Sequence, residues 1–352
     1  GSEMCIRDRA YDSVGRVVSE TDYEGHTTSY AYNTYGQQES VSRPVEAGKV
    51  AETVYGYDSS GNRALEKVKT TAVSAGGEDT WRKSYTGYDS RNRVDYVAQE
   101  EEDGSKTYTK YFYDARGNVK KVATGLTVAN ITESAIPEGA HVTEYSYHKY
   151  LNKATSVTLP DGTEQYYDYN YWGLVEEQGY ERDGERYGKV INTYNTIGEL
   201  LKQTAEDGKE NVYEYNMLGQ LSKVEDESGV RLYSYNDRGL LSTEYSGNYT
   251  KTYTYDANGN LLTETKGGEV VTNYTYNANN WLTGKTNKKT DNTLLSQYTY
   301  SHYRDGNIYQ ENAGFKKEDD TWQVQNRTYA YDPQGRLKQV TEGSSVTSYT
   351  YD

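Results

Sequence analysis

The sequence has very little cysteine, proline, methionine or phenylalanine, and it has no long apolar run. Its single cysteine is Cys5, so no intrachain disulfide can form. No stretch approaches the roughly 18 apolar residues that a membrane-spanning helix needs, so no membrane span is expected. Four prolines and 33 glycines without a three-residue period exclude collagen. The net charge is −15 and there is no Lys/Arg block, so a nucleic-acid partner is not expected.

The chain is unusually rich in tyrosine. It supplies 41 of the 352 residues, against 2 phenylalanines. The mean hydropathy of −1.02 is typical of disordered chains, but tyrosine favours strands and buries its ring well. The spacing of the tyrosines therefore decides whether this composition folds.

The string Tyr-Asp/Asn-x-x-Gly-x-Leu/Val recurs in about fifteen copies on a base of about 20 residues. The regular copies supply the structural motif residues, which are Tyr11, Asp12, Gly15, Tyr57, Asp58, Gly61, Tyr113, Asp114, Gly117, Tyr194, Asn195, Gly198, Tyr215, Asn216, Gly219, Tyr235, Asn236, Gly239, Tyr255, Asp256, Gly259, Tyr331, Asp332 and Gly335. In degenerate copies Asn92 and Asn280 replace the glycine, and in the copy at Tyr147 the glycine position is assigned to Leu151, which Asn152 follows. The copy at Tyr300 is interpreted as carrying one extra residue before Gly306.

Each copy predicts one β-hairpin. An aromatic residue two positions before the motif tyrosine places both rings on one face of a strand. Asp or Asn then opens a turn, and glycine closes it with a positive φ, as we expect for Gly219, Gly239 and Gly259. Because one hairpin is unstable alone, neighbouring copies should stack their tyrosines into cross-strand ladders. The predicted fold is all-β: a β-solenoid formed by a spiralling antiparallel strip of hairpins.

This pattern resembles the YD repeat of the RHS/YD-repeat family, which includes bacterial polymorphic toxins, wall-associated proteins and teneurins. The resemblance covers nearly all of residues 10–352. It implies a strip that forms part of a hollow shell, which commonly encloses a C-terminal toxin released by aspartyl self-cleavage. The family's core segment for that cleavage is absent, because the one Asp-Pro pair, Asp332-Pro333, lies in an ordinary repeat where proline suits a turn.

The organisation is predicted as a leader over residues 1–9 and a single array over 10–352. The leader resembles a cloning scar and a sequencing adaptor and is excluded from the fold. The array has about 14 hairpins and one truncated copy, with insertions near 71–82, 125–141 and 313–322. The insertion at 125–141 should project or fold over an edge, and it is the first place to look for a contact surface. Unpaired end strands predict head-to-tail self-association through the Tyr11 and Tyr351 ends.

No catalytic, cofactor-binding or metal-binding residues are predicted. The four histidines are scattered, and no HExxH or GxSxG motif is present. The turn from Asp256 to Asn260 resembles half of a calcium loop, but no bidentate Glu follows at the required position. The acidic runs 100–103 and 318–320 are interpreted as solvated turn tips.

Tryptophan supplies the candidate glycan contacts: Trp172, Trp81 and Trp322. Trp81 and Trp322 occur in similar Asp-Thr-Trp contexts within the two steps of 31 residues, which favours an anchoring role in a longer hairpin. Trp172 lies within a turn and should be exposed, and Trp281 is assigned to the Leu position of its repeat.

The favoured function is a non-enzymatic structural shell segment of a secreted or cell-surface protein that encapsulates a C-terminal toxin or effector. The alternative is an adhesion or carbohydrate-binding β-solenoid whose partner is a cell-surface glycan. An enzyme is not expected, because no set of nucleophile, base and oxyanion donors can be named.

Overall fold

The computed structural model describes residues 6–22, 25–46, 49–71, 79–247, 249–317, 321–332 and 335–351. These residues are almost entirely antiparallel strands, as the repeat predicts, with one short 3-10 helix at Glu133–Ala135. By contacts the chain divides into two units: unit 1 contains residues 1–86, 99–105 and 251–352, and unit 2 contains 87–98 and 106–250.

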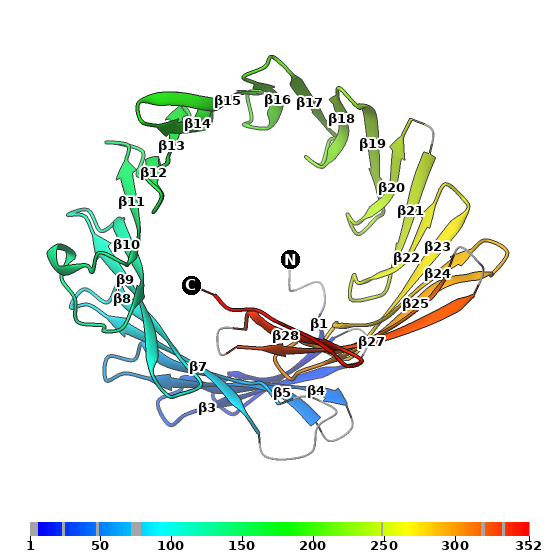
Figure 1. Ribbon diagram of the computed structural model, residues 1–352, viewed down its shortest axis with the longest axis horizontal. Coiled ribbons are helices and arrows are strands. Elements are labelled where there is room, and N and C mark those ends of the chain that lie inside the picture. The colour runs from blue at the N-terminus through cyan, green and yellow to red at the C-terminus, as the bar shows by residue number, and fades with distance from the viewer. Residues whose placement is uncertain are drawn as a thin grey trace. The chain divides into compact units, whose positions relative to one another are not determined.

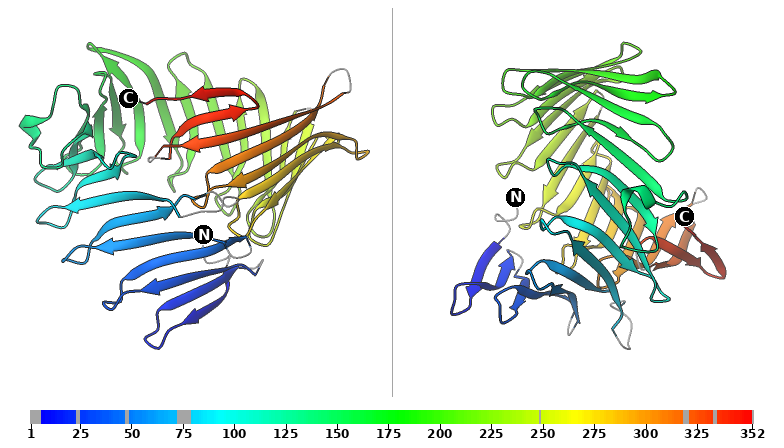
Figure 2. Two further views of the ribbon diagram at one scale, coloured as in Figure 1. Left: turned by 60° about the horizontal axis from the view of Figure 1, so that its bottom comes forward. Right: turned by 90° about the vertical axis from the view of Figure 1, so that its left-hand side faces the viewer.

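Successive strands pair with one another along the chain in both units (Figure 1). Those of unit 1 are β1 (Ile6–Tyr11), β2 (Val17–Asp22), β3 (Thr27–Tyr32), β4 (Gln38–Glu46), β5 (Lys49–Tyr57), β6 (Arg63–Lys69), β22 (Leu261–Lys266), β23 (Val270–Tyr276), β24 (Leu282–Lys289), β25 (Leu294–His302), β26 (Ile308–Lys316), β27 (Trp322–Tyr331), β28 (Leu337–Glu342) and β29 (Ser345–Ser348). Figure 2 shows the early strands (blue) and the late strands (orange to red) of this unit as two runs of neighbouring hairpins.

Unit 2 continues the same pattern. Its strands are β9 (Lys106–Tyr113), β10 (Val119–Leu126), β11 (His141–Tyr147), β12 (Ala154–Thr158), β13 (Glu164–Tyr169), β14 (Val175–Arg182), β15 (Glu185–Tyr194), β16 (Leu200–Ala205), β17 (Glu210–Tyr215), β18 (Leu221–Asp226), β19 (Gly229–Tyr235) and β20 (Leu241–Ser246). Strands β7 (Trp81–Tyr88), β8 (Val94–Glu100) and β21 (Tyr249–Tyr255) have residues in both units.

The motif residues occupy equivalent places in every regular copy. The tyrosine ends the first strand of the hairpin, and the following Asp or Asn holds the turn with its side chain. In one copy Asn216 Oδ1 accepts hydrogen bonds from the backbone N–H of Leu218 at 2.9 Å and of Gln220 at 3.0 Å. The glycine then takes a positive φ, which is 74° at Gly219 and 75° at Gly239. Asn92, Asn152 and Asn280 take it in the degenerate copies, because asparagine tolerates this conformation.

In many copies the residue after the glycine position complements the residue that opens the turn. Where the turn opens with Asp, an acceptor, the partner is a donor, as for Arg93 Nε on Asp89 Oδ2 at 2.8 Å. Where it opens with Asn, the amide N–H₂ needs an acceptor, as for Asn33 Nδ2 on Gln37 Oε1 at 2.9 Å. In these copies the two hydrogen-bonding types vary together. The turns opened by Asn170, Asn236 and Asn277 have no such side-chain partner, because Leu174, Leu240 and Trp281 follow there and only their backbone N–H groups bond to the asparagine.

Motif tyrosines connect each repeat to the one before it. The Tyr235 hydroxyl donates to the backbone oxygen of Leu221 at 2.7 Å, where the return strand of the preceding hairpin begins. Equivalent hydrogen bonds are made by Tyr32, Tyr57, Tyr113, Tyr147, Tyr169, Tyr194, Tyr215, Tyr276 and Tyr351. The motif tyrosines therefore link consecutive repeats through these hydroxyl contacts.

The core is thin because the strip is a single layer of strands. Fully buried apolar residues are few, and Leu126 is the largest side chain less than 2% exposed among the described residues. Stability therefore depends mainly on strand pairing and half-buried tyrosines, which suits a chain of such low mean hydropathy.

Two copies depart from the expected register. At β25 the residue that pairs with the start of the return strand is His302, opposite Ile308, and not Tyr300. His302 thus takes the motif tyrosine position and Tyr303 takes the Asp position, so this copy has no extra residue. The extra residue lies instead in the copy at Tyr147, which pairs with Ala154. Trp281 also lies one position before the expected one, since Leu282 begins β24 and the Trp281 ring packs 5.4 Å from that of His302.

The insertions extend or cap hairpins. The segment at 125–141 folds back onto its own hairpin, because Glu133 forms ion pairs with Lys120 at 2.6 Å and Lys121 at 3.5 Å. The insertion at 313–322 lengthens the hairpin of β26 and β27, in which Lys316 pairs with Trp322. Most of the insertion at 71–82 lies outside the described residues. Residues 1–5 of the leader also lie outside them, while residues 6–9 form part of β1.

Candidate functional site: the seam of unit 1

The turns of the late repeats in unit 1 contact the opposite edge of its early repeats, and we call this line of contacts the seam. Asn258 Nδ2 donates to Asp22 Oδ2 at 3.0 Å, and Asn279 Nδ2 donates to the Pro44 backbone oxygen at 3.0 Å. Both asparagines lie at the third position after the motif tyrosine, so they form the tips of their turns. Strands more than 200 residues apart in sequence are fastened together in this way.

Asp22 is the polar centre of the first part of the seam. It accepts from the His26 backbone N–H at 2.8 Å and forms an ion pair with Arg43. Burial alone would raise the pKa of Asp22, but these hydrogen bonds and the Arg43 charge hold it below its usual value. The carboxylate is therefore charged when the Asn258 turn docks on it.

A second contact joins the copy at His302 to strand β6. The Arg304 backbone N–H donates to the Thr71 oxygen at 3.0 Å, and its guanidinium pairs with Asp79 at 2.6 Å. Asp79 also binds Lys69 Nζ at 3.0 Å, and hydrogen bonding from Lys69 is the main cause of its lowered pKa. Lys69 binds Glu52 as well, at 2.7 Å, so two carboxylates neutralise this buried ammonium.

The third contact is almost fully buried. Arg82 Nη1 lies 3.0 Å from Asp305 Oδ2, and the Asp305 side chain is only 3% exposed. The motif glycine Gly335 also contacts Arg82, because a Cβ there would lie 2.8 Å from Arg82 Nη1. Any larger residue at this glycine would have to displace the Arg82 guanidinium.

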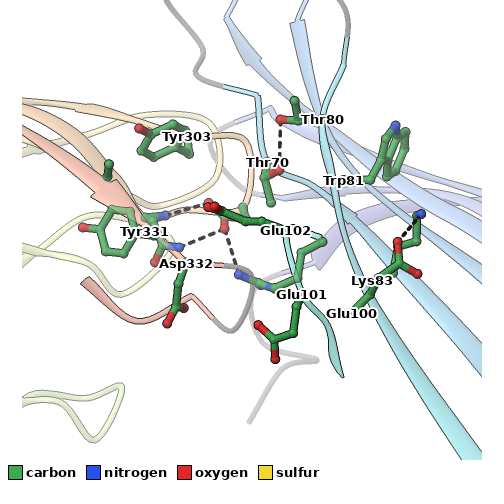
Figure 3. Close-up of a pocket in the computed structure, with 14 residues that line it drawn as sticks. Thr70, Thr80, Trp81, Lys83, Glu100, Glu101, Glu102, Tyr303, Tyr331 and Asp332 are labelled. Carbon is green, nitrogen blue, oxygen red and sulfur yellow. Dashed lines mark hydrogen bonds and ion pairs between the residues drawn. The ribbon is translucent and has the colours of Figure 1, made fainter. Parts of the chain in front are cut away.

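A cleft of about 490 Å³ opens along the seam (Figure 3). Its lining combines aromatic rings with charged groups: Thr70, Thr80, Trp81, Arg82, Lys83, Glu100, Glu101, Glu102, Tyr303, Asp305, Asn307, Ala330, Tyr331 and Asp332. Burial raises the pKa of Tyr303 and of Tyr331, so both hydroxyls stay protonated at neutral pH.

Several of the carboxylates in the cleft are already neutralised by cations or hydroxyls. Glu100 binds Lys83 Nζ at 2.6 Å and the Tyr85 hydroxyl at 2.6 Å. Glu102 binds Lys338 Nζ at 2.6 Å, which links the turn after β8 to β28. The acidic run at 100–103 is therefore partly a seam element and not simply a solvated turn tip. The run at 318–320 lies outside the described residues.

Asp332 holds an ordinary repeat turn. Its Oδ1 accepts from the Arg336 backbone N–H at 2.8 Å and its Oδ2 binds Arg336 Nε at 2.7 Å. Pro333, the other half of the Asp-Pro pair, lies outside the described residues. Both carboxylate oxygens of Asp332 are thus used by the turn.

The three candidate glycan residues belong to three different hairpins. Trp81 lies on β7 in the cleft, with Lys69 Nζ 5.0 Å from its ring centroid. Trp322 begins β27 and covers Gly314, where a Cβ would lie 2.6 Å from its ring. Each of the two is paired across its hairpin with a lysine, which supports the anchoring interpretation. Trp172 lies at a turn tip of unit 2 and is 78% exposed, as its position predicts.

Two searches for specific site types gave no candidate. Within the residues that the structure describes, no group of three or more His, Cys, Asp or Glu side chains is arranged to hold a metal ion. None of the described helices has the length and apolar character needed to cross a membrane.

Comparison with known proteins identifies the repeat. The family model for the RHS Repeat matches residues 11–45 and 255–291. A curated relative, the tRNA3(Ser)-specific nuclease WapA of Bacillus spizizenii, is 25% identical over 238 residues, which is 63% of this chain and 8% of the nuclease. Two stretches of the chain thus match the RHS Repeat model, and the chain spans only a small part of this relative.

Solved structures share the fold over nearly the whole chain. The crystal structure of TcdB2-TccC3 matches 97% of this chain and 22% of its own, with a TM-score of 0.60 and 14% identity. A Tc holotoxin pore from Photorhabdus luminescens matches 97% of this chain and 22% of its own, with a TM-score of 0.58 and 14% identity. These likenesses show that the chain shares the all-β hairpin fold of these structures.

Proposed function

We propose that this chain is a structural, non-enzymatic segment of the shell of a secreted or cell-surface RHS protein, and that the shell encloses a toxin or effector domain of the same protein. The observation that carries the proposal is that neighbouring repeats are linked by tyrosine hydroxyl bonds and that late repeats are fastened to early ones at the seam. Such a strip gains rigidity from every repeat without needing a thick core.

The comparisons support this proposal at the level of fold. Tc toxin structures contain the same architecture, and a relative with matching repeats is described as a nuclease. Because this chain matches only 8% of the nuclease, we assign the toxic activity of the proposed parent protein to another part of it. The cleft supports the same view, since Asp305, Glu100 and Glu102 are bound by Arg82, Lys83 and Lys338.

Protease protection tests the proposal directly. The full-length protein that contains this segment is digested with a broad-specificity protease, and survival of the effector is followed by mass spectrometry. We expect the effector to survive in the full-length protein and to be digested when it is expressed alone. An effector mixed with this chain in trans is the control and should also be digested. Equal digestion in the full-length and isolated forms would contradict encapsulation.

The glycan-binding alternative has less support. Trp81 and Trp322 are engaged by lysine or glycine of their own hairpins, and Trp172 is 78% exposed at a turn tip. We retain it as a hypothesis for Trp172 only. Binding of oligosaccharides to the chain, lost in Trp172→Ala, would support it.

We also propose head-to-tail association through the end strands. Among the described strands, β1 pairs with β2 and β29 with β28, which leaves one edge of each for another strand. This association is open-ended, so sedimentation should show a series of growing species with increasing concentration. A single species over the whole range would contradict it.

A further inference from the structure

Asn258, a tip residue of the seam, belongs to the only Asn-Gly pair in the sequence. Other copies of the motif place Ser60, Arg116 or Arg238 before the glycine, so the turn itself does not require asparagine there. Asparagine is chemically labile before glycine, because glycine has no side chain to shield its backbone nitrogen. The most labile asparagine of the chain is therefore one that fastens the seam.

The reaction of such a pair is deamidation. The backbone nitrogen of Gly259 attacks Cγ of Asn258, the Cγ–Nδ2 bond breaks, and Nδ2 leaves as ammonia with the proton that Gly259 gives up. Water then opens the resulting succinimide ring at one of its two carbonyls, which leaves aspartate or isoaspartate. The reaction consumes only water and involves no change of oxidation state, so the chain needs no further reactant.

The closed seam holds both reacting groups in hydrogen bonds. The Gly259 backbone N–H donates to the Asp256 oxygen at 3.2 Å. Asn258 Nδ2 donates to Asp22 Oδ2 and to Asn280 Oδ1, both at 3.0 Å. Ring closure removes the proton from the first group and expels the second, so all three hydrogen bonds have to be released. The reaction should therefore proceed from molecules in which this part of the seam is open.

The product of the reaction does not fit the closed seam. A carboxylate at position 258 has no N–H to donate, and it would face Asp22 Oδ2 and Asn280 Oδ1, which both accept at these contacts. The Asn280 amide is held in its orientation, since its Oδ1 also accepts from Asn260 Nδ2 at 2.9 Å. Asp22 is only 8% exposed and already pairs with Arg43, so two carboxylates would have to share that guanidinium. Isoaspartate would in addition lengthen the backbone inside the turn.

We propose that Asn258 is a deamidation site that the closed seam protects, and that its conversion to aspartate or isoaspartate releases the first part of the seam. Opening of the seam permits the reaction, and the reaction makes the opening permanent. In the proposed shell this would unfasten late repeats of unit 1 from early ones. That consequence rests on the proposed function, whereas the chemistry at Asn258 does not.

Peptide mapping by mass spectrometry, after incubation at mildly alkaline pH, tests the protection. Asn258 should deamidate fastest in an isolated peptide of residues 251–265 and slowest in the folded parent chain. Asp22→Ala removes one seam acceptor and should raise the rate in the folded chain about tenfold, because one charge-assisted hydrogen bond no longer favours the closed seam. Asp58→Ala is the matched control, since Asp58 accepts from the Asn62 backbone N–H in an equivalent turn of another repeat, and it should deamidate like the parent.

Hydrogen exchange followed by mass spectrometry tests the opening. Asn258→Asp reproduces one product of the reaction and should increase exchange in residues 25–46 and 261–282, on the two sides of the seam. Exchange in residues 194–235 of unit 2 should not change. Asn170→Asp is the charge-matched control, because Asn170 opens a turn of unit 2 at a position where other copies carry aspartate, and it should exchange like the parent at the seam.

A reversed pair provides the rescue. Asp22→Asn combined with Asn258→Asp again sets one amide donor against one carboxylate acceptor, so exchange at the seam should return towards that of the parent. Recovery in the double variant would assign the opening to this contact and not to a general effect of added charge. Equal exchange in the double variant and in Asn258→Asp alone would contradict that assignment.

Equal deamidation rates in the folded parent and the isolated peptide would overturn the protection by the seam. Parent-like exchange in Asn258→Asp would overturn the opening of the seam by the product. These two measurements decide the proposal even if Asp22→Ala loses its β-structure, which circular dichroism would reveal. All of them are made on this chain alone, so their failure is distinct from a failure of protease protection, which needs the full-length protein.

Discussion

At the scale of the residue, the motif turns require glycines with a positive φ. Gly239 has a φ of 75°, and a Cβ there would lie 3.2 Å from Gln220 Nε2, which donates to the Gly239 oxygen. Gly239→Val should therefore lower the free energy of unfolding by about 1–2 kcal/mol through backbone strain. Thermal unfolding by circular dichroism measures this. Gly139→Val is the control, because Gly139 has open space around it and no positive φ. Equal destabilisation by the two variants would contradict the turn assignment.

The hydroxyl of the motif tyrosine is a second residue-scale determinant. Tyr235→Phe keeps the ring but leaves the Leu221 oxygen without its donor at 2.7 Å. We expect a loss of about 1 kcal/mol, the usual value for one hydrogen bond. Tyr35→Phe is the matched control, since Tyr35 is 88% exposed. Denaturant unfolding checks both variants. An unchanged midpoint for Tyr235→Phe would show that the hydroxyl hydrogen bond does not contribute to stability.

At the scale of the element, many of the motif turns are closed by a matched pair of side chains. Asp89→Asn would set an amide N–H₂ against the Arg93 Nε donor, which now binds Asp89 at 2.8 Å. We expect this variant to be destabilised and Arg93→Gln to restore stability in the double variant, because the pair would then match Asn33 and Gln37. A double-mutant cycle should give a favourable coupling on the order of 0.5 kcal/mol. Additive effects would mean that the pairing rule has no energetic basis.

Local patterns in the sequence predicted the elements well, because a turn is specified by residues within a few positions of it. The Tyr-to-Gly spacing located the strand ends, and the shared Asp-Thr-Trp context indicated the related hairpins of Trp81 and Trp322. The prediction placed the motif tyrosine of this copy at Tyr300, whereas the structure places His302 in that position. Counting four residues back from Gly306, as in the other copies, gives His302 from the sequence alone. The hydrogen-bonded pair formed by the residue that opens the turn and the residue four positions later is also a local feature, so it too can be read from the sequence.

The seam could not be predicted in this way. Asn258 and Asp22 are 236 residues apart, and nothing near either residue marks the other as a partner. Their contact depends on the accumulated twist of many hairpins, which no local pattern specifies. The same reason explains why Glu102 was expected in solvent and instead binds Lys338.

At the scale of the whole molecule, tyrosine sets the alkaline limit of stability. The hydrogen bond to Glu100 and burial raise the pKa of Tyr85 to about 12, and burial with a nearby glutamate raises the pKa of Tyr30 and Tyr274 to about 12. An unfolded tyrosine ionises near pH 10. Because the folded chain holds these protons more tightly, this contribution to stability is complete below pH 10 and is lost as the pH rises towards 12.

The melting temperature should therefore fall steeply between pH 10 and pH 12, and tyrosinate absorbance should rise together with the loss of β-structure. Many motif tyrosines share the effect, since burial also raises the pKa of Tyr194, Tyr235 and Tyr255. Tyr85→Phe removes one of the most shifted groups, so its melting temperature should depend less on pH in this window than that of Tyr35→Phe. Ionisation of all the tyrosines, the buried ones included, near pH 10 while the β-structure persists would show that the hydroxyls do not contribute to holding the repeats together.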